Sequence, residues 1–160
     1  MADNDRSDTD PRSPFLPPRW VVRSAWKIHR GLYRWTGGRF GLRDPRADRY
    51  GLAFLTTTGR HSGVERGVMI GYYADGDDLV TMAMNGWGAP EPAWWLNLQS
   101  DPRATLTLTD GTIDVIGRAA TGSERERLWD RWRRLDKGLD GYASRRPSET
   151  AVVILTPAVN

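Results

Sequence analysis

The sequence has 160 residues, of which 39% are apolar and 10% aromatic, and its formal net charge is +3. This is the length of one domain, enough to bury roughly two-thirds of the surface that the unfolded chain exposes. There is no Cys, and His29 and His61 are the only histidines, so a disulfide framework, a thiolate centre and a zinc site are excluded and no metal is expected. All basic residues except Lys27 and Lys137 are Arg, which suits recognition of phosphate or carboxylate.

Residues 1–18 are rich in Asp, Ser and Pro, which predicts a flexible tail that ends at Pro17-Pro18. The tail lacks the basic start and apolar run of a secretory signal. No later stretch approaches the roughly 18 apolar residues of a membrane-spanning helix. We therefore expect a cytoplasmic protein with one folded domain over residues 19–157.

The segment 19–37 has apolar residues at helical spacing and is followed by a Gly pair, which predicts the first helix. Basic residues on this segment follow the same steps and form a stripe with several Trp side chains nearby. The stripe is typical of an amphipathic helix on an anionic membrane, here the inner face of the plasma membrane. The alternative is a core-covering helix with a solvated basic face. The stripe consists of Arg19, Arg23, Lys27, Arg30 and Arg34.

The next part of the chain predicts strands. Residues 51–58 favour a strand that ends at Gly59. Strands at 66–73 and 79–84 flank the turn sequence Asp-Gly-Asp-Asp at 75–78, which predicts a hairpin.

The second half predicts a helix, a hairpin, a longer helix and a closing strand. The hairpin turns at Asp110-Gly111, and the longer helix begins at Ser123 with Glu126 as its capping-box partner. Barrel closure removes exposed strand edges, so we expect a mainly β fold with α-helices packed outside a small antiparallel barrel. No dinucleotide-binding or P-loop motif is present. The four elements are the helix 92–99, the strands 104–109 and 112–118, the helix from Ser123 through Leu135, and the strand 151–155.

Three segments are candidates for binding chemistry. At 56–66, backbone amides, the Ser62 hydroxyl and two guanidinium groups can converge on a phosphate. At 82–90, glycines allow a flat ligand to approach the backbone, and at 92–98 a helix N-terminus can face an electron-rich group. Taken singly, these segments are equally explained as an ordinary loop, a turn and a core-packed helix.

Taken together, the segments resemble the deazaflavin-dependent nitroreductase family over residues 19–157. The resemblance implies a split β-barrel that binds coenzyme F420, a deazaflavin with a phosphate and oligoglutamate tail. It further implies hydride transfer between the reduced coenzyme and a lipophilic acceptor such as a quinone or nitro compound. The matching stretches are LYRWTGGRFG at 32–41, LTTTGRHSG at 55–63, NGWGAPEPAWWLNL at 85–98, DPRATLTL at 101–108, ATGSERERLW at 120–129 and VVILTP at 152–157.

The resemblance also implies which residues bind the coenzyme. A loop grips the phosphate, two strands line the ring, and the backbone of a short helix completes the pocket. The phosphate residues are Arg60, His61, Ser62 and Arg66. The ring residues are Gly67, Val68, Met69, Ile70, Met82, Ala83, Met84 and Asn85. The helix residues are Ala93, Trp94, Trp95, Leu96 and Asn97.

The sequence departs from the usual family pattern at several places. His61 stands where a second Lys or Arg is common, which predicts weaker or pH-dependent phosphate affinity because histidine can lose its charge near neutral pH. Met84-Asn85 replaces a typical Ser-Lys pair. Tyr142 is the hypothetical catalytic residue, as proton donor or substrate-orienting group, and the alternative is that it only caps the barrel mouth.

A lipophilic small molecule is the expected partner, and the absence of a recognised motif argues against nucleic acid. One alternative is a non-catalytic carrier of a fatty acid or other lipid on the same barrel. Another is FMN or haem binding in a related barrel. The Arg-rich composition and the resemblance together favour an actinobacterial source.

Overall fold

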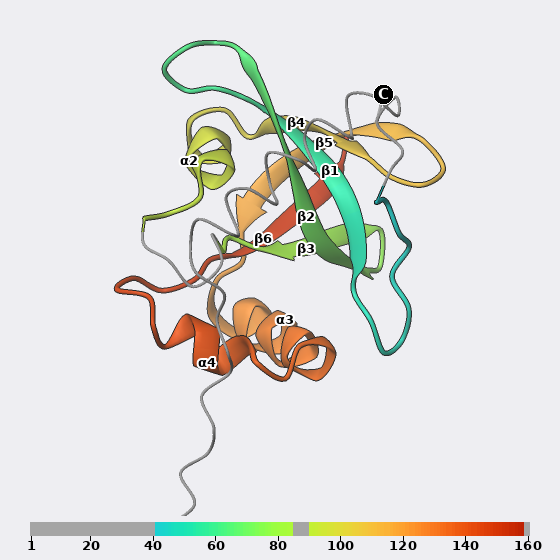
Figure 1. The fold of residues 1–160 in the computed structure, drawn as a ribbon, viewed down its shortest axis with the longest axis vertical. Coiled ribbons are helices and arrows are strands. Elements are labelled where there is room, and N and C mark those ends of the chain that lie inside the picture. Colours follow the sequence, from blue (N-terminus) through green and yellow to red (C-terminus); the bar gives the residue numbers. More distant parts are fainter. Residues whose placement is uncertain (1–40, 85–89, 159–160) are drawn as a thin grey trace, which may run out of the picture.

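The computed structural model describes residues 41–84 and 90–158, so the predicted tail at 1–18 and helix at 19–37 lie outside the described residues. Within them, the predicted antiparallel barrel is confirmed, and it closes in the strand order β1-β2-β3-β6-β5-β4 (Figure 1). The strands are β1 (Gly51–Thr58), β2 (Glu65–Asp75), β3 (Asp78–Met82), β4 (Arg103–Thr107), β5 (Thr112–Ala119) and β6 (Val152–Pro157). The helices of this part of the chain are α2 (Ala93–Ser100), α3 (Gly122–Leu135) and α4 (Leu139–Ala143).

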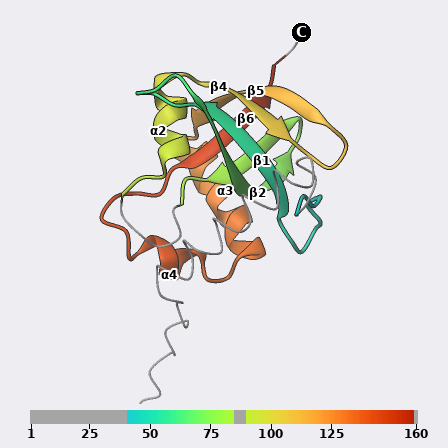
Figure 2. The same ribbon diagram turned by 45° about the horizontal axis from the view of Figure 1, so that its top comes forward.

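The helices cover the barrel from two sides. Figures 1 and 2 show α2 on one side, with α3 and α4 together on another. The core accordingly has two layers, one inside the barrel against α2 and one between the barrel and α3. Trp94, Trp95 and Leu98 of α2 join the first layer, whereas Leu128 and Trp132 of α3 join the second.

Strand β6 contributes to both core layers. Val153 and Leu155 face the barrel interior, whereas Val152 and Ile154 face α3. All four are at most 2% exposed. Burial on both faces explains why this segment is an unbroken apolar run, and the predicted closing strand is confirmed.

The first hairpin is confirmed, and the second differs by one residue. Asp75 pairs with Asp78, and Gly76 has a φ of 64°, the left-handed conformation that favours glycine in tight turns. In the β4–β5 hairpin the Leu108 amide donates to the Gly111 carbonyl at 2.7 Å. Thr109 and Asp110 therefore form the tip, instead of Asp110-Gly111. A hydrogen bond from the Thr109 hydroxyl to the Asp44 carboxylate holds this tip.

Two local predictions are wrong. Helix α3 begins at Gly122 with Thr121 as N-cap and has no side-chain cap hydrogen bond, so Ser123 and Glu126 form no capping box. Strand β3 ends at Met82 rather than Met84, because the Met84 amide donates to the Met82 carbonyl at 2.8 Å and bends the chain. Helix α4 was not predicted.

Candidate functional site

A cavity of about 1110 Å³ runs along one edge of β2. Strand β2 pairs with β1 from Glu65 to Tyr72 but with β3 only from Tyr73 to Asp75. Among the described residues, the second edge of the earlier stretch therefore has no strand partner. Such an edge presents backbone N–H and C=O groups to whatever lies beside it. The cavity is thus lined by main chain as well as by side chains.

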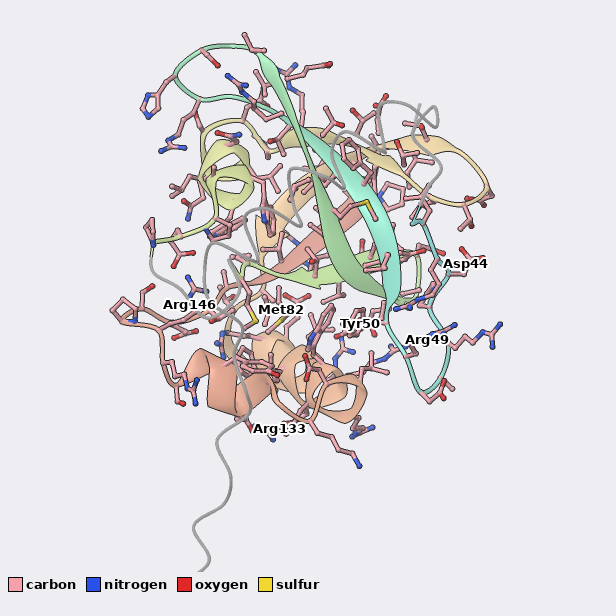
Figure 3. The ribbon with its side chains drawn as sticks, in the orientation of Figure 1. Asp44, Arg49, Tyr50, Met82, Arg133 and Arg146 are labelled. Atoms are coloured by element: carbon pink, nitrogen blue, oxygen red, sulfur yellow. The ribbon has the colours of Figure 1, made fainter. Side chains whose placement is uncertain are left out.

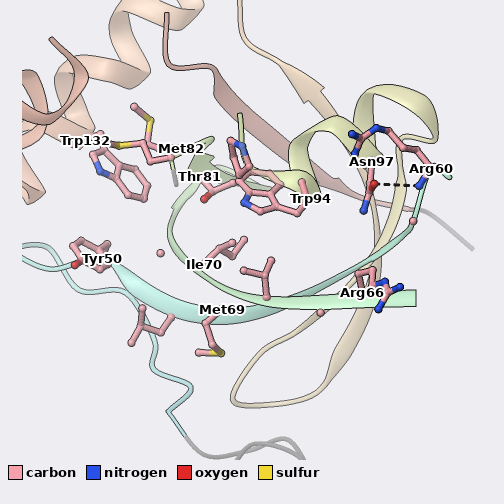
Figure 4. A pocket seen from close by; sticks show the side chains of 18 of the residues that line it. Tyr50, Arg60, Arg66, Met69, Ile70, Thr81, Met82, Trp94, Asn97 and Trp132 are labelled. Carbon is pink, nitrogen blue, oxygen red and sulfur yellow. Dashed lines mark hydrogen bonds between the residues drawn. The ribbon is translucent and has the colours of Figure 1, made fainter. Parts of the chain in front are cut away.

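One end of the cavity is cationic (Figure 4). Arg60, His61 and Ser62 follow β1, and Arg66 lies near the start of β2, so the strand pair brings the loop and the second arginine together. All four residues are exposed. Their side chains are therefore accessible to an anion, as the sequence predicted for a phosphate.

Several backbone amides of this loop already donate within the protein, which leaves fewer of them for the predicted backbone cradle. The Gly59 amide donates to the Val64 carbonyl, and the Ser62 and Gly63 amides both donate to the Gly59 carbonyl. The Arg60 amide donates to Asn97 Oδ1 at 3.1 Å. Anion binding at this end consequently depends mainly on the side chains.

The middle of the cavity is apolar. Ile70 of β2 points toward Trp94 of α2, with Thr81 and Met82 of β3 nearby, whereas Met69 points to the opposite face of β2 (Figure 4). Val68 packs against the same core cluster as Ile70 and Trp94. Ile70, Met82 and Trp94 are each less than 10% exposed, at 6%, 6% and 7%. This part can hold a flat, largely apolar group away from water.

The far end is aromatic and was not predicted as part of the site. Tyr50 and Trp132 stack at 5.8 Å between ring centroids with a 13° angle, and Asp136 lies beside them in the cavity lining. Gly71 makes this possible, since a Cβ there would lie 3.0 Å from the Tyr50 ring. Trp132 was predicted only as part of the helix from Ser123 through Leu135, and nothing in the local sequence separates Tyr50 from other strand-flanking aromatics. Their meeting depends on how α3 packs on the barrel.

Most of the predicted coenzyme residues line this one cavity, and among the described residues three of them do not. Ala83 and Trp95 are buried in the barrel core, at 0% and 6% exposed, and Leu96 lies on another side of α2. Tyr142 lies on α4, where its ring packs against Gly138. Asn85 is outside the described residues. The predicted residues that line the cavity are Arg60, His61, Ser62, Arg66, Gly67, Val68, Met69, Ile70, Met82, Met84, Ala93, Trp94 and Asn97.

A buried arginine that the sequence did not reveal lies between the end of β3 and the start of α2. The Arg146 guanidinium donates to Glu91 Oε1 at 2.8 Å, to the Ala83 carbonyl at 2.6 Å and to the Thr150 hydroxyl at 3.0 Å. Figure 3 shows Arg146 beside the Met82 end of β3. Arg146 thus connects Ala83, which follows β3, with Glu91, which precedes α2. The sequence shows it only as one Arg among many.

Burial raises the pKa values of two tyrosines of β2. Burial, with smaller contributions from the Asp44 and Asp110 carboxylates, raises the pKa of Tyr72 to about 12. Burial also raises the pKa of Tyr73, whose hydroxyl donates to the Leu128 carbonyl at 2.9 Å. In the described part of the chain no group of three acidic or histidine side chains is placed to hold a metal ion.

Comparison with known proteins identifies the family. The F420H(2)-dependent quinone reductase family matches residues 25–157. F420H(2)-dependent quinone reductases of Mycobacterium tuberculosis and Mycobacterium bovis are each 28% identical over 145 residues, covering 86% of this chain and 96% of theirs. The fold is shared with a solved F420-H2 dependent reductase, FDR-A, at a TM-score of 0.59 and 24% identity, over 65% of this chain and 92% of that one. The chain belongs to the F420H(2)-dependent quinone reductase family and is an oxidoreductase that uses coenzyme F420.

Proposed function

We propose that this cavity holds coenzyme F420 in one orientation, with the phosphorylated tail at the Arg60 and Arg66 end and the ring in the apolar middle. The observation that carries the proposal is the polarity of the cavity, which is cationic and open at one end and apolar beyond it. The coenzyme has the same polarity, an anionic tail attached to a flat ring. Matched polarity orients a ligand as well as binding it.

The residues present fit this group. Guanidinium groups bind phosphate oxygens in paired hydrogen bonds, and Arg60 and Arg66 have exposed side chains with no ion pair among the described residues. The open edge of β2 offers main-chain donors and acceptors beside the apolar middle. When bound, coenzyme F420 supplies the hydride-transfer chemistry. The protein's part is to orient the ring and to exclude water, for which Ile70, Met82 and Trp94 are suitable.

We place the acceptor at the aromatic end. A quinone is planar and largely apolar, and offset stacking on the exposed part of the Tyr50 ring is favourable for such a molecule. Quinones are the acceptors that the family implies, and nitro compounds are a further candidate. The role of Tyr142 as proton donor or orienting group stays a hypothesis. Its ring packs against Gly138 and is not part of the cavity lining.

Peripheral membrane contact, at the cytoplasmic face, is a further part of the proposal. Its support is the basic, Trp-bearing sequence of residues 19–37, which lies outside the described residues. No helix in the described ranges is long and apolar enough to span a membrane.

Coenzyme titration tests the proposed binding mode. We expect the purified protein to bind coenzyme F420 more tightly than FMN. Replacing either arginine, as Arg60→Ala or Arg66→Ala, should weaken F420 binding by about tenfold, because a charge-assisted contact to the phosphate is lost. Arg49→Ala, at an exposed arginine of the loop before β1, is the matched control and should bind as the wild type does. Equal affinity for FMN and F420, or unchanged binding in both cavity variants, would contradict the proposal.

A further inference from the structure

The loop that carries Arg60 is fastened by a buried amide on another element. Asn97 of α2 is 4% exposed, and its Oδ1 accepts the Arg60 amide at 3.1 Å (Figure 4). A backbone N–H can only donate, so the carbonyl side of the Asn97 amide must face Arg60. The Nδ2 group then faces Thr57 and donates to its hydroxyl at 3.0 Å.

Thr57 extends this contact to the second arginine. The Thr57 side chain is buried in β1, at 2% exposed, and its hydroxyl lies 3.5 Å from the Arg66 carbonyl. Thr57 and Arg66 are also direct neighbours in the β1–β2 register. One side chain of α2 therefore meets both the loop that bears Arg60 and the strand position opposite Arg66.

The Asn97 side chain has little hydrogen-bonding capacity left for a ligand. Its Oδ1 and one Nδ2 hydrogen are used within the protein, and the residue is almost fully buried. A buried polar side chain inside an apolar helix face is retained only where partners satisfy it, and here those partners are the main chain of Arg60 and the side chain of Thr57.

We propose that Asn97 is a positioning residue, which sets the placement of Arg60 relative to Arg66 and thereby the affinity for the phosphorylated tail without contacting the tail. This inference rests on the proposed function. Removing the Asn97 side chain should leave the guanidinium groups of Arg60 and Arg66 present, but the distance between their backbone positions should no longer be fixed. The ring end of the cavity lies elsewhere along β2 and should keep its shape.

The test compares two ligands on the same variants. One is coenzyme F420, and the other is a deazaflavin riboside that has the ring but neither phosphate nor glutamates. For Asn97→Ala we expect about tenfold weaker binding of F420 and less than about a twofold change for the riboside, both read from ligand fluorescence. Gln99→Ala, at an exposed position of the same helix, should change neither.

Thr57→Val keeps the inference testable if Asn97→Ala does not fold. It removes the hydroxyl that links Asn97 to Arg66 in a near-isosteric way, and F420 binding should weaken while riboside binding holds. Unchanged F420 affinity in the folded variants, or equal losses for both ligands, would overturn the inference. If the wild type itself binds the two ligands equally, the tail site proposed above is wrong, which is a separate and recognisable failure.

Discussion

The guanidinium group of Arg146 is a positive charge buried away from water. Its side chain is 0% exposed, whereas the Glu91 side chain is 25% exposed. Arg146 Nε and Glu91 Oε2 are buried with no hydrogen-bond partner among the described residues, so the pair is satisfied only in part. Such a pair adds little net stability compared with an apolar filling, but removing one partner leaves the other charge without compensation.

Arg146→Ala should therefore destabilise the protein by about 3–5 kcal/mol, because the Ala83 carbonyl and the Thr150 hydroxyl lose a donor and the Glu91 carboxylate loses its cationic partner. The free energy of unfolding from urea denaturation measures this. Arg145→Ala, at the exposed neighbouring position, should stay within about 0.5 kcal/mol of the wild type. Equal stability of the two variants would contradict the role given to Arg146.

Helix α3 is fastened to the β2–β3 hairpin by charge as well as by its apolar face. Asp75, at the end of β2, accepts hydrogen bonds from Arg127 at 2.8 and 3.0 Å and from Arg131 at 3.0 Å. The Arg131 guanidinium also lies 4.5 Å from the centre of the Tyr73 ring. These contacts fix the direction of α3 on the barrel, and Trp132 lies on this helix beside Tyr50.

Acid should loosen this attachment. The Arg127 hydrogen bond is the main cause that holds the pKa of Asp75 below its ordinary value, and the Arg131 charge acts in the same direction. A lowered folded-state pKa stabilises the protein above the ordinary Asp pKa, and this contribution is lost as the pH falls through the folded-state value. Asp75→Asn should therefore be less stable near neutral pH and should lose less stability below about pH 4.

Thermal unfolding followed from pH 7 to pH 3 checks the Asp75 prediction. Asp77→Asn, at the exposed turn of the same hairpin, is the control and should follow the wild-type curve. Parallel curves for Asp75→Asn and the wild type would show that Asp75 does not contribute to the acid response.

The elements were predictable where local chemistry decides them. The Asp-Gly-Asp-Asp turn at 75–78 and the apolar run of β6 were predicted correctly, because turn residues and two-sided burial leave a direct sequence pattern. The β4–β5 tip was misplaced by one residue, since the register of the two strands, which pairs Thr107 with Thr112, sets it. The same limit applies to the site. The arginine loop has a local motif, whereas the Tyr50–Trp132 pair and the Arg146–Glu91 pair exist only through tertiary packing.

At the scale of the whole molecule, the cavity is lined by elements of both core layers, the one inside the barrel and the one under α3. Its lining includes β2, β3, α2 and α3 and the loops after β1 and before it. A ligand that spans the cavity contacts elements from both core layers at once. Binding should therefore stabilise the whole fold rather than one end of it.

Coenzyme F420 at about 100 times its dissociation constant should raise the free energy of unfolding by about 2.7 kcal/mol, because it binds only the folded chain. A shift of the melting temperature with coenzyme concentration measures the effect. The double variant Arg60→Ala/Arg66→Ala should need a higher coenzyme concentration for the same shift. A melting temperature that does not depend on the coenzyme would exclude binding at this level.

The position of β6 between β3 and β5 has a kinetic consequence. Leu155 pairs with both Leu79 and Gly117, so the ring of strands is complete only when a late segment joins two earlier ones. Pairing over such sequence separations imposes a loop-closure cost before it gains contacts, which slows folding relative to helical domains of similar size. Until that step, β3 and β5 each expose an unpaired edge. Folding intermediates are thus the state in which this chain is most prone to aggregate, whereas the finished barrel has few edges to offer.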